Sequence, residues 1–105
     1  MGKPDTRRLD KAIRETTRKL EAVRERETWP LNSRERRAVL GAVASGAYNL
    51  HRGNGTARAD RTLDNTWQSA ETRLIAEITA LQVERQRVVN EAAAAKAAKK
   101  SSGWW

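Results

Sequence analysis

The sequence feature that most constrains the fold is an uninterrupted stretch of forty residues, 60–99, which contains neither glycine nor proline. Within this stretch an apolar residue recurs at every seventh position, the spacing of one helix face, at Trp67, Leu74, Leu81, Val88 and Ala95. At 1.5 Å per residue such a helix is about 60 Å long. The rest of the chain is too short to cover it fully, so its far end projects into solvent, pairs with a second copy or docks on a partner.

Two shorter helices are predicted ahead of the long one. In residues 5–27, five residues are spaced alternately by four and three positions and form one stripe: Leu9, Ile13, Thr16, Leu20 and Val23. We expect Asp5 to cap the start of this helix. Pro30 disfavours helical geometry at Trp29, so the helix ends before that point. Trp29 and Trp67 are expected in the core because large apolar residues are scarce.

The second helix is predicted over residues 33–51. Asn32 and Glu35 have the spacing of a capping box at its start. After it, the two glycines of Gly53-Asn54-Gly55 readily take a positive φ, so this segment is expected to be a loop or C-cap. Small residues dominate this helix, so we expect it to be the central, closely packed one. Four of its residues are expected to face the neighbouring helices: Val39, Val43, Ala47 and Leu50.

These patterns predict an all-α protein in which two shorter helices, 5–27 and 33–51, pack on the first half of a long third helix, 60–99. We expect that third helix to project partly and to lead into a flexible C-terminal tail. Residues 1–90 are predicted to form a single helical domain, and residues 91–105 an Ala/Lys-rich tail that ends in two tryptophans.

The composition argues against several classes of protein. Leucine, isoleucine and valine together number 17 of 105 residues, and phenylalanine and cysteine are absent, so neither a deep apolar pocket nor a disulfide scaffold is expected. His51 is the one histidine, and together with Asp60 and Asp64 it is a weak metal signal. We therefore expect no enzyme activity, metal, cofactor or small-molecule substrate. No apolar run is long enough for a membrane span and the first residues lack a secretory signal, so a cytoplasmic protein is expected.

The net charge of +8 is concentrated in the first half, since residues 1–53 carry +6 whereas residues 60–91 carry −2. In the first helix, four basic residues are spaced by four, three and four positions, roughly 200° around from the apolar stripe: Arg7, Lys11, Arg14 and Arg18. A row of cations backed by a packed stripe suits a phosphate backbone. The alternative is a solvated face supported by pairs with Glu15 and Glu21.

Three more arginines crowd the first turn of the second helix: Arg34, Arg36 and Arg37. The positive end of the helix dipole disfavours cations there unless an anion binds. A phosphate held by these arginines would remove the conflict. The alternative is pairing with acidic residues, either Glu25 and Glu27 of the preceding segment or those of the third helix, whose residues 60–91 carry a net charge of −2.

The sequence therefore predicts a non-enzymatic, basic helical protein that binds the nucleic-acid backbone through these seven residues. Arginine outnumbers lysine 15 to 6 and alanine is abundant, as GC-rich genomes tend to encode, so we expect an actinobacterial source or a phage or mobile-element accessory or regulator. The alternative is an adaptor that docks on a protein partner, or on a second copy through residues 78–95. Its expected contacts lie on the long helix and in the tail: Leu81, Val88, Trp104 and Trp105.

Overall fold

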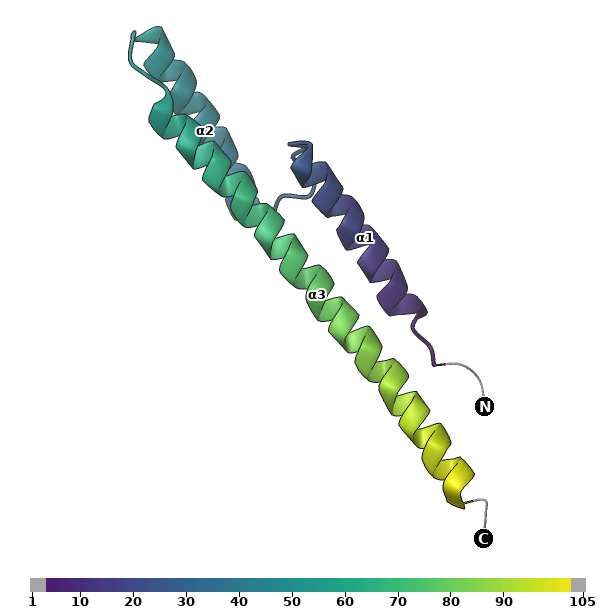
Figure 1. The fold of residues 1–105 in the computed structure, drawn as a ribbon. Coiled ribbons are helices and arrows are strands. Elements are labelled where there is room, and N and C mark those ends of the chain that lie inside the picture. The colour runs from purple at the N-terminus through teal and green to yellow at the C-terminus, as the bar shows by residue number, and fades with distance from the viewer. Residues whose placement is uncertain (1–3, 103–105) are drawn as a thin grey trace.

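The computed structural model describes residues 4–102, and these form three α-helices and no strand: α1 (Arg7–Arg24), α2 (Ser33–His51) and α3 (Ala57–Ser102). Figure 1 shows α1 and α2 following one another along α3, both antiparallel to it. The result is a rod of 84 × 18 × 17 Å with a radius of gyration of 22.2 Å, against about 13 Å for a compact chain of this length. The predicted all-α class, with three helices and a long third one, is confirmed.

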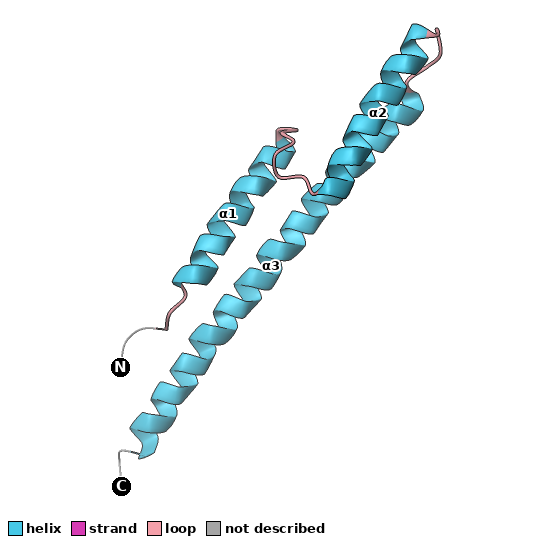
Figure 2. Ribbon diagram, turned by 180° about the vertical axis from the view of Figure 1, so that it is seen from behind, coloured by secondary structure: helices cyan, strands magenta, loops and turns pink. Residues whose placement is uncertain are grey.

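The position of α1 differs from the prediction. Arg24, at its last turn, pairs with Glu71 at 3.1 Å, and Arg85 donates to Asp10 near its start at 2.6 Å. These pairs place α1 beside the later part of α3, whereas α2 lies beside the earlier part (Figure 2). The prediction that both short helices share the first half of the long helix is therefore wrong.

The connector between α1 and α2 explains this arrangement, because it lets the chain continue in the same direction. After α1 the backbone N–H groups of Arg26 and Glu27 donate to the carbonyls of Val23 and Ala22, at 2.9 and 2.8 Å. Arg26 has a φ of 64°, which is the left-handed backbone geometry often found just after the last turn of an α-helix. Glycine is the usual residue at that position, and here it is an arginine. The helix ends at Arg24 rather than at the predicted residue 27.

The core lies where the end of α1, the connector and the start of α2 meet the middle of α3. Seven buried residues form it: Leu20, Val23, Leu31, Val39, Trp67, Ala70 and Leu74. Ala70 and Leu74 are completely buried, because residues of both α1 and α2 pack around this part of α3. Trp67 is in the core as predicted. Trp29 is half-exposed instead, and its ring N–H donates to Glu27 at 2.8 Å.

α2 contacts α3 through a stripe that is offset from the predicted one. Val39 and Ala42 are buried, and a Cβ added at Gly46 would lie only 3.2 Å from the Cβ of Ala59. The two helices therefore approach closely along this side. The other three residues that were predicted to face neighbours are exposed: Val43, Ala47 and Leu50. The central helix is α3, since it alone contacts both others.

The caps of α2 follow the sequence closely. Asn32 accepts from the backbone N–H of Glu35 at 2.8 Å, and Glu35 accepts from that of Asn32 at 3.0 Å, which completes the predicted capping box. At the other end Gly53 has a φ of 78°, the left-handed geometry that favours glycine. The predicted bounds of 33–51 are those of the structure.

α3 runs without a break from Ala57 to Ser102, so the helix continues through the first part of the segment predicted to be a tail. Residues 93–100 are all exposed, and Figure 1 shows this end of the helix extending beyond α1. The predicted partial projection is therefore present. Within the described part of the chain, none of the three helices combines the length and the apolar character that crossing a bilayer requires. Trp104 and Trp105 lie outside the described residues.

Candidate nucleic-acid interface

The outer face of α1 carries the predicted row of cations. Arg7, Lys11, Arg14 and Arg18 are all exposed, whereas Thr16, Leu20 and Val23 on the opposite side are buried. Thr16 satisfies its buried hydroxyl by donating to the carbonyl of Ala12 at 2.7 Å. The row extends from residue 7 to residue 18, eleven steps along the helix, or about 16 Å.

Most of this row has no acidic partner. Arg7 pairs with Asp5 at 3.4 Å, and both side chains are highly exposed. The backbone N–H of Arg7 donates to Asp5 and, with the guanidinium, lowers the pKa of that carboxyl. Lys11, Arg14 and Arg18 have no carboxylate within ion-pairing distance among residues 4–100. Exposed pairs contribute little, so the whole row is available to an anionic ligand.

The arginines of α3 behave differently. Arg85 pairs with Asp10, and the hydrogen bond from Arg85, aided by one from Thr6, lowers the pKa of Asp10. Arg87 pairs with both Glu84 and Glu91, and these two carboxylates raise its pKa, Glu84 most. Arg73 likewise pairs with two glutamates. Arg73, Arg85 and Arg87 of α3 are thus paired within the fold, whereas the row on α1 faces outward.

The glutamates that recur every seven residues on α3 also pair within that helix. Glu77 accepts from Arg73 at 3.1 Å, and Glu84 and Glu91 flank Arg87. Acids that neutralise neighbouring arginines one turn away are structural. They keep this part of α3 near neutrality, which leaves α1 as the cationic side of the rod at this level.

The three arginines at the start of α2 are exposed, and none has a carboxylate partner among residues 4–100: Arg34, Arg36 and Arg37. The alternative of pairing with Glu25 and Glu27 does not occur in the structure, where Glu27 accepts from the Trp29 ring instead. Arg36 reaches only the carbonyl of Leu31, at 3.5 Å, which is long for a hydrogen bond. The conflict between these cations and the helix dipole therefore persists in the free protein.

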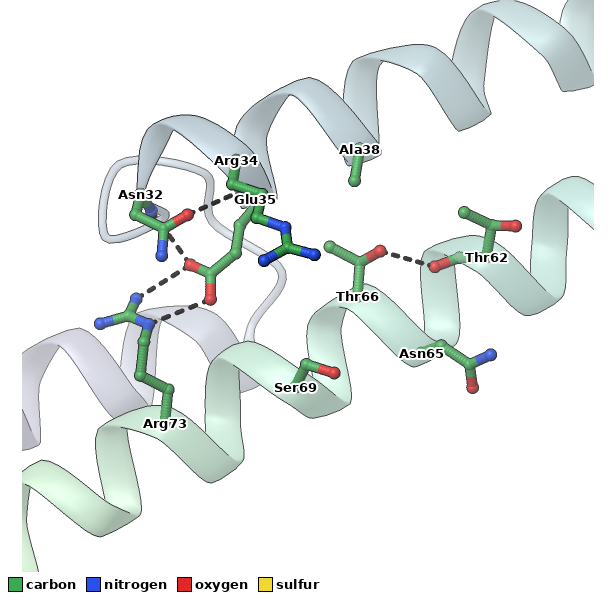
Figure 3. A pocket seen from close by; sticks show the side chains of 9 residues that line it. All are labelled: Asn32, Arg34, Glu35, Ala38, Thr62, Asn65, Thr66, Ser69 and Arg73. Carbon is green, nitrogen blue, oxygen red and sulfur yellow. Dashed lines mark hydrogen bonds and ion pairs between the residues drawn. The ribbon is translucent and has the colours of Figure 1, made fainter.

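Arg34 points into an open polar groove of about 610 Å³ between the start of α2 and α3. Figure 3 shows its guanidinium opposite the polar side chains that α3 contributes, Thr62, Asn65, Thr66 and Ser69. One end of the groove is closed by Glu35, which Arg73 holds through two hydrogen bonds of 2.9 and 3.0 Å. Because Arg73 neutralises Glu35, Arg34 supplies the unbalanced charge of the groove.

The sequence analysis did not single out these polar residues of α3. The feature that could have identified them is a lack of charge. Positions 62, 65, 66, 69 and 72 all carry hydroxyl or amide side chains and no charged group. Neutral donors of this kind make many of the sugar–phosphate contacts in protein–nucleic acid complexes. The hydroxyls of Thr62 and Thr66 donate to carbonyls within α3, so Asn65 and Ser69 are the groove residues that extend the cationic start of α2 with uncharged donors.

No family model, curated protein or solved structure matches this chain.

Two of the four predicted partner residues, Leu81 and Val88, lie in the described part of the chain. Leu81 and Val88 are half-buried, and Arg85, which lies between them on the same face, pairs with Asp10 of α1. The part of α3 that was predicted to form a dimer is thus partly covered by α1. The described residues hold no group of three or more His, Asp or Glu side chains placed to bind a metal. Asp64, one of the acids considered for a metal, pairs with Arg26 at 3.2 Å.

Proposed function

We propose that this protein binds the sugar–phosphate backbone of duplex nucleic acid through the outer face of α1 and the start of α2. The observation that carries the proposal is a contrast in pairing among residues 4–100: Lys11, Arg14 and Arg18 have no carboxylate partner there, while Arg73, Arg85 and Arg87 of α3 each have one. Cations left free on one face are available to neutralise phosphates and release counterions.

The dimensions of α1 fit this role. The row of four cations spans about 16 Å, and B-DNA carries a charge every ~1.7 Å of its axis. Several phosphates therefore come within reach of one rigid helix. Long basic side chains contacting phosphate give affinity without base preference, so we expect binding with little sequence specificity.

The test is binding of a fluorescent DNA duplex and of an RNA duplex of the same sequence, measured by anisotropy. The triple variant Lys11→Gln, Arg14→Gln, Arg18→Gln removes three charges from the α1 row. The matched control, Arg58→Gln, Arg61→Gln, Lys96→Gln, removes three exposed charges from α3 that have no carboxylate partner among residues 4–100. We expect the first variant to lose at least tenfold in affinity and the control to lose much less.

Equal losses in the two variants would show that net charge alone attracts the duplex, and that result would contradict a dedicated α1 face. No measurable binding by the wild-type protein at low salt would contradict the function itself. Circular dichroism of each variant shows that the helices remain intact, because all six positions are exposed.

A second proposal is that the chain also contacts a protein. It is supported by exposed apolar side chains on one part of α2: Leu40, Val43 and Leu50. A cluster of this kind on a soluble surface marks an interaction site. This surface differs from the predicted contacts at Leu81 and Val88, which are half-buried.

A further inference from the structure

One flank of α2 carries a second apolar stripe that none of the described residues, 4–102, covers. Leu40, Val43 and Leu50 are 63%, 53% and 69% exposed. With Ala47 they are spaced by three, four and three positions, so they form one straight stripe along a helix face. This chain has few large apolar residues, yet three of them are exposed on one helix. Burying each of these side chains would contribute about 1.5–3 kcal/mol of stabilisation.

A shallow groove continues the stripe toward α3. It holds about 220 Å³ and is lined mostly by apolar and small residues, with Val43, Ala47 and Leu50 on the side of α2 and Ala59 and Leu63 on the side of α3. At this end of the rod the fold is only two helices thick, as Figure 1 shows. Two antiparallel helices with an open apolar face have the form of one half of a four-helix bundle.

The order of residues in the stripe is self-complementary. If a second copy of α2 lies antiparallel against the first, Leu40 of each copy faces Leu50 of the other, and Val43 faces Ala47. Large residues then meet at both ends, and smaller ones meet near the two-fold axis. A two-fold interface requires a patch that matches itself in this way, whereas a site for an unrelated protein has no such requirement.

Charge complementarity points to the same occupant. Arg36 lies one turn before Leu40 on the same stripe and has no acidic partner among the described side chains. Asp60 borders the groove at the opposite end of the hairpin. Its carboxylate accepts from the Thr56 hydroxyl at 3.1 Å and has no basic partner within residues 4–100. The antiparallel arrangement brings Arg36 of one copy to the end of the hairpin where the other copy carries Asp60. It also places that cation near the negative end of the second α2.

We propose that this protein forms a two-fold dimer in which the outer stripes of two α2 helices pack antiparallel and the two α2–α3 hairpins form a four-helix core. The α1 helices lie beside the other half of each α3, so their cationic faces stay outside this interface. The dimer rests on the second proposal, a protein contact through this surface of α2, and not on the α1 row. Of the proposed phosphate-binding residues it uses only Arg36, so its dissociation constant is measured without nucleic acid. The dimer places two α1 faces toward opposite ends of a longer rod.

Two measurements on the full chain test the dimer. Sedimentation over a hundredfold range of concentration should give a mass of twice 11.8 kDa at the upper end. Small-angle X-ray scattering should give a maximum dimension of roughly 140 Å, because two rods of 84 Å overlap only along α2, which is about 28 Å long. A dimer through residues 78–95 with the rods side by side would stay much shorter.

Variants locate the interface. Val43→Glu places a charge beside the two-fold axis and should raise the dissociation constant more than tenfold. Val83→Glu is the matched control, because Val83 is 65% exposed on α3 and outside the stripe. Arg36→Glu and Asp60→Arg should each weaken the dimer, and combining them in one chain should restore at least part of the affinity.

A chain that stays monomeric throughout this range would overturn the proposal, and so would equal dissociation by Val43→Glu and Val83→Glu. A dimer of about 85 Å in length would also overturn it, since that length requires another surface. Asp60→Arg also alters the start of α3, so its melting temperature is measured alone. If the charge swap fails while Val43→Glu dissociates the dimer, the antiparallel register is wrong.

Discussion

The ion pair between Arg73 and Glu35 fixes the start of α2 against α3, and removing it gives the sharpest test of the packing. Arg73 donates to both oxygens of Glu35, at 3.0 and 2.9 Å, and to the carbonyl of Pro30 at 3.3 Å. It therefore joins α3 to both the connector and α2. We expect Arg73→Met, which keeps the aliphatic packing, to loosen this junction.

The magnitude follows from the burial of the pair. Glu35 is 11% exposed and Arg73 is 31% exposed, so the pair lies between the surface and the interior. Exposed pairs contribute about 0.2–1 kcal/mol, and a hydrogen bond to a charged group contributes about 1.5–3 kcal/mol. For a two-pronged pair at this depth we expect a coupling of about 2 kcal/mol, a large share of a typical unfolding free energy of ~5–15 kcal/mol.

A double-mutant cycle isolates that coupling. Glu35→Gln removes the charge but keeps an oxygen that can accept from Asn32 in the capping box. Urea unfolding of the wild-type protein, the two single variants and the double variant, followed by circular dichroism, gives the four free energies. Additive effects, with a coupling below about 0.5 kcal/mol, would refute the structural role of the pair.

The pH dependence of the same variants checks the charge of Glu35. Burial raises the pKa of Glu35, but the hydrogen bonds from Arg73 and from the Asn32 backbone N–H outweigh it and lower the pKa below its usual 4.5. Because the folded-state pKa is the lower one, the stabilisation is complete above this value and is lost as the pH falls through the folded pKa. The stability difference between wild type and Glu35→Gln should shrink below pH 4.5, and a constant difference would contradict this.

Two further predictions concern backbone geometry. Gly41→Ala should stabilise the fold by about 1 kcal/mol in thermal unfolding, since the new Cβ meets nothing within 4 Å. Gly46→Ala should gain less stability because its Cβ meets the Cβ of Ala59 at 3.2 Å. Equal gains in the two variants would contradict the close packing of α2 on α3. Arg26→Gly should be about 1 kcal/mol more stable than Arg26→Ala. Both variants lose the contact with Trp67, but only glycine suits a φ of 64°. An alanine variant as stable as the glycine variant would contradict backbone strain at this position.

The helices were predictable from the sequence because their signals are local. The capping box of Asn32 and Glu35 and the left-handed Gly53 fixed the ends of α2. The absence of glycine and proline over 60–99 identified α3, which begins three residues earlier, at Ala57. Each of these signals involves residues within a few positions of one another.

The placement of α1 was not predictable because it depends on distant partners. The apolar stripe of α3 continues from Trp67 through Leu81, so either half could receive α1 by hydrophobic pattern alone. The deciding contacts, such as Asp10 with Arg85, join residues 75 positions apart. The left-handed residue that ends α1 is an arginine, so the usual glycine signal was missing.

The candidate site likewise has features that the sequence predicts and features that depend on distant contacts. The spacing of Arg7, Lys11, Arg14 and Arg18 was enough to place them on the outer face of α1, because helical geometry determines it. That the arginines of α2 have no carboxylate partner among residues 4–100 could not be inferred, since Glu27 accepts from the Trp29 ring and Glu35 is held by Arg73. The apolar side of α2 was misassigned because small residues at Ala42 and Gly46 make the packed stripe look weaker than the exposed one.

The most direct test of the central claim, that the α1 face neutralises phosphates, is the salt dependence of duplex binding. The logarithm of the association constant should fall linearly with the logarithm of salt concentration, and each phosphate contact contributes about 0.9 to the slope. Removing the charges of Lys11, Arg14 and Arg18 should therefore reduce the slope by about 2.7. A slope that is the same in the triple variant and in the wild-type protein would show that these residues do not contact phosphate.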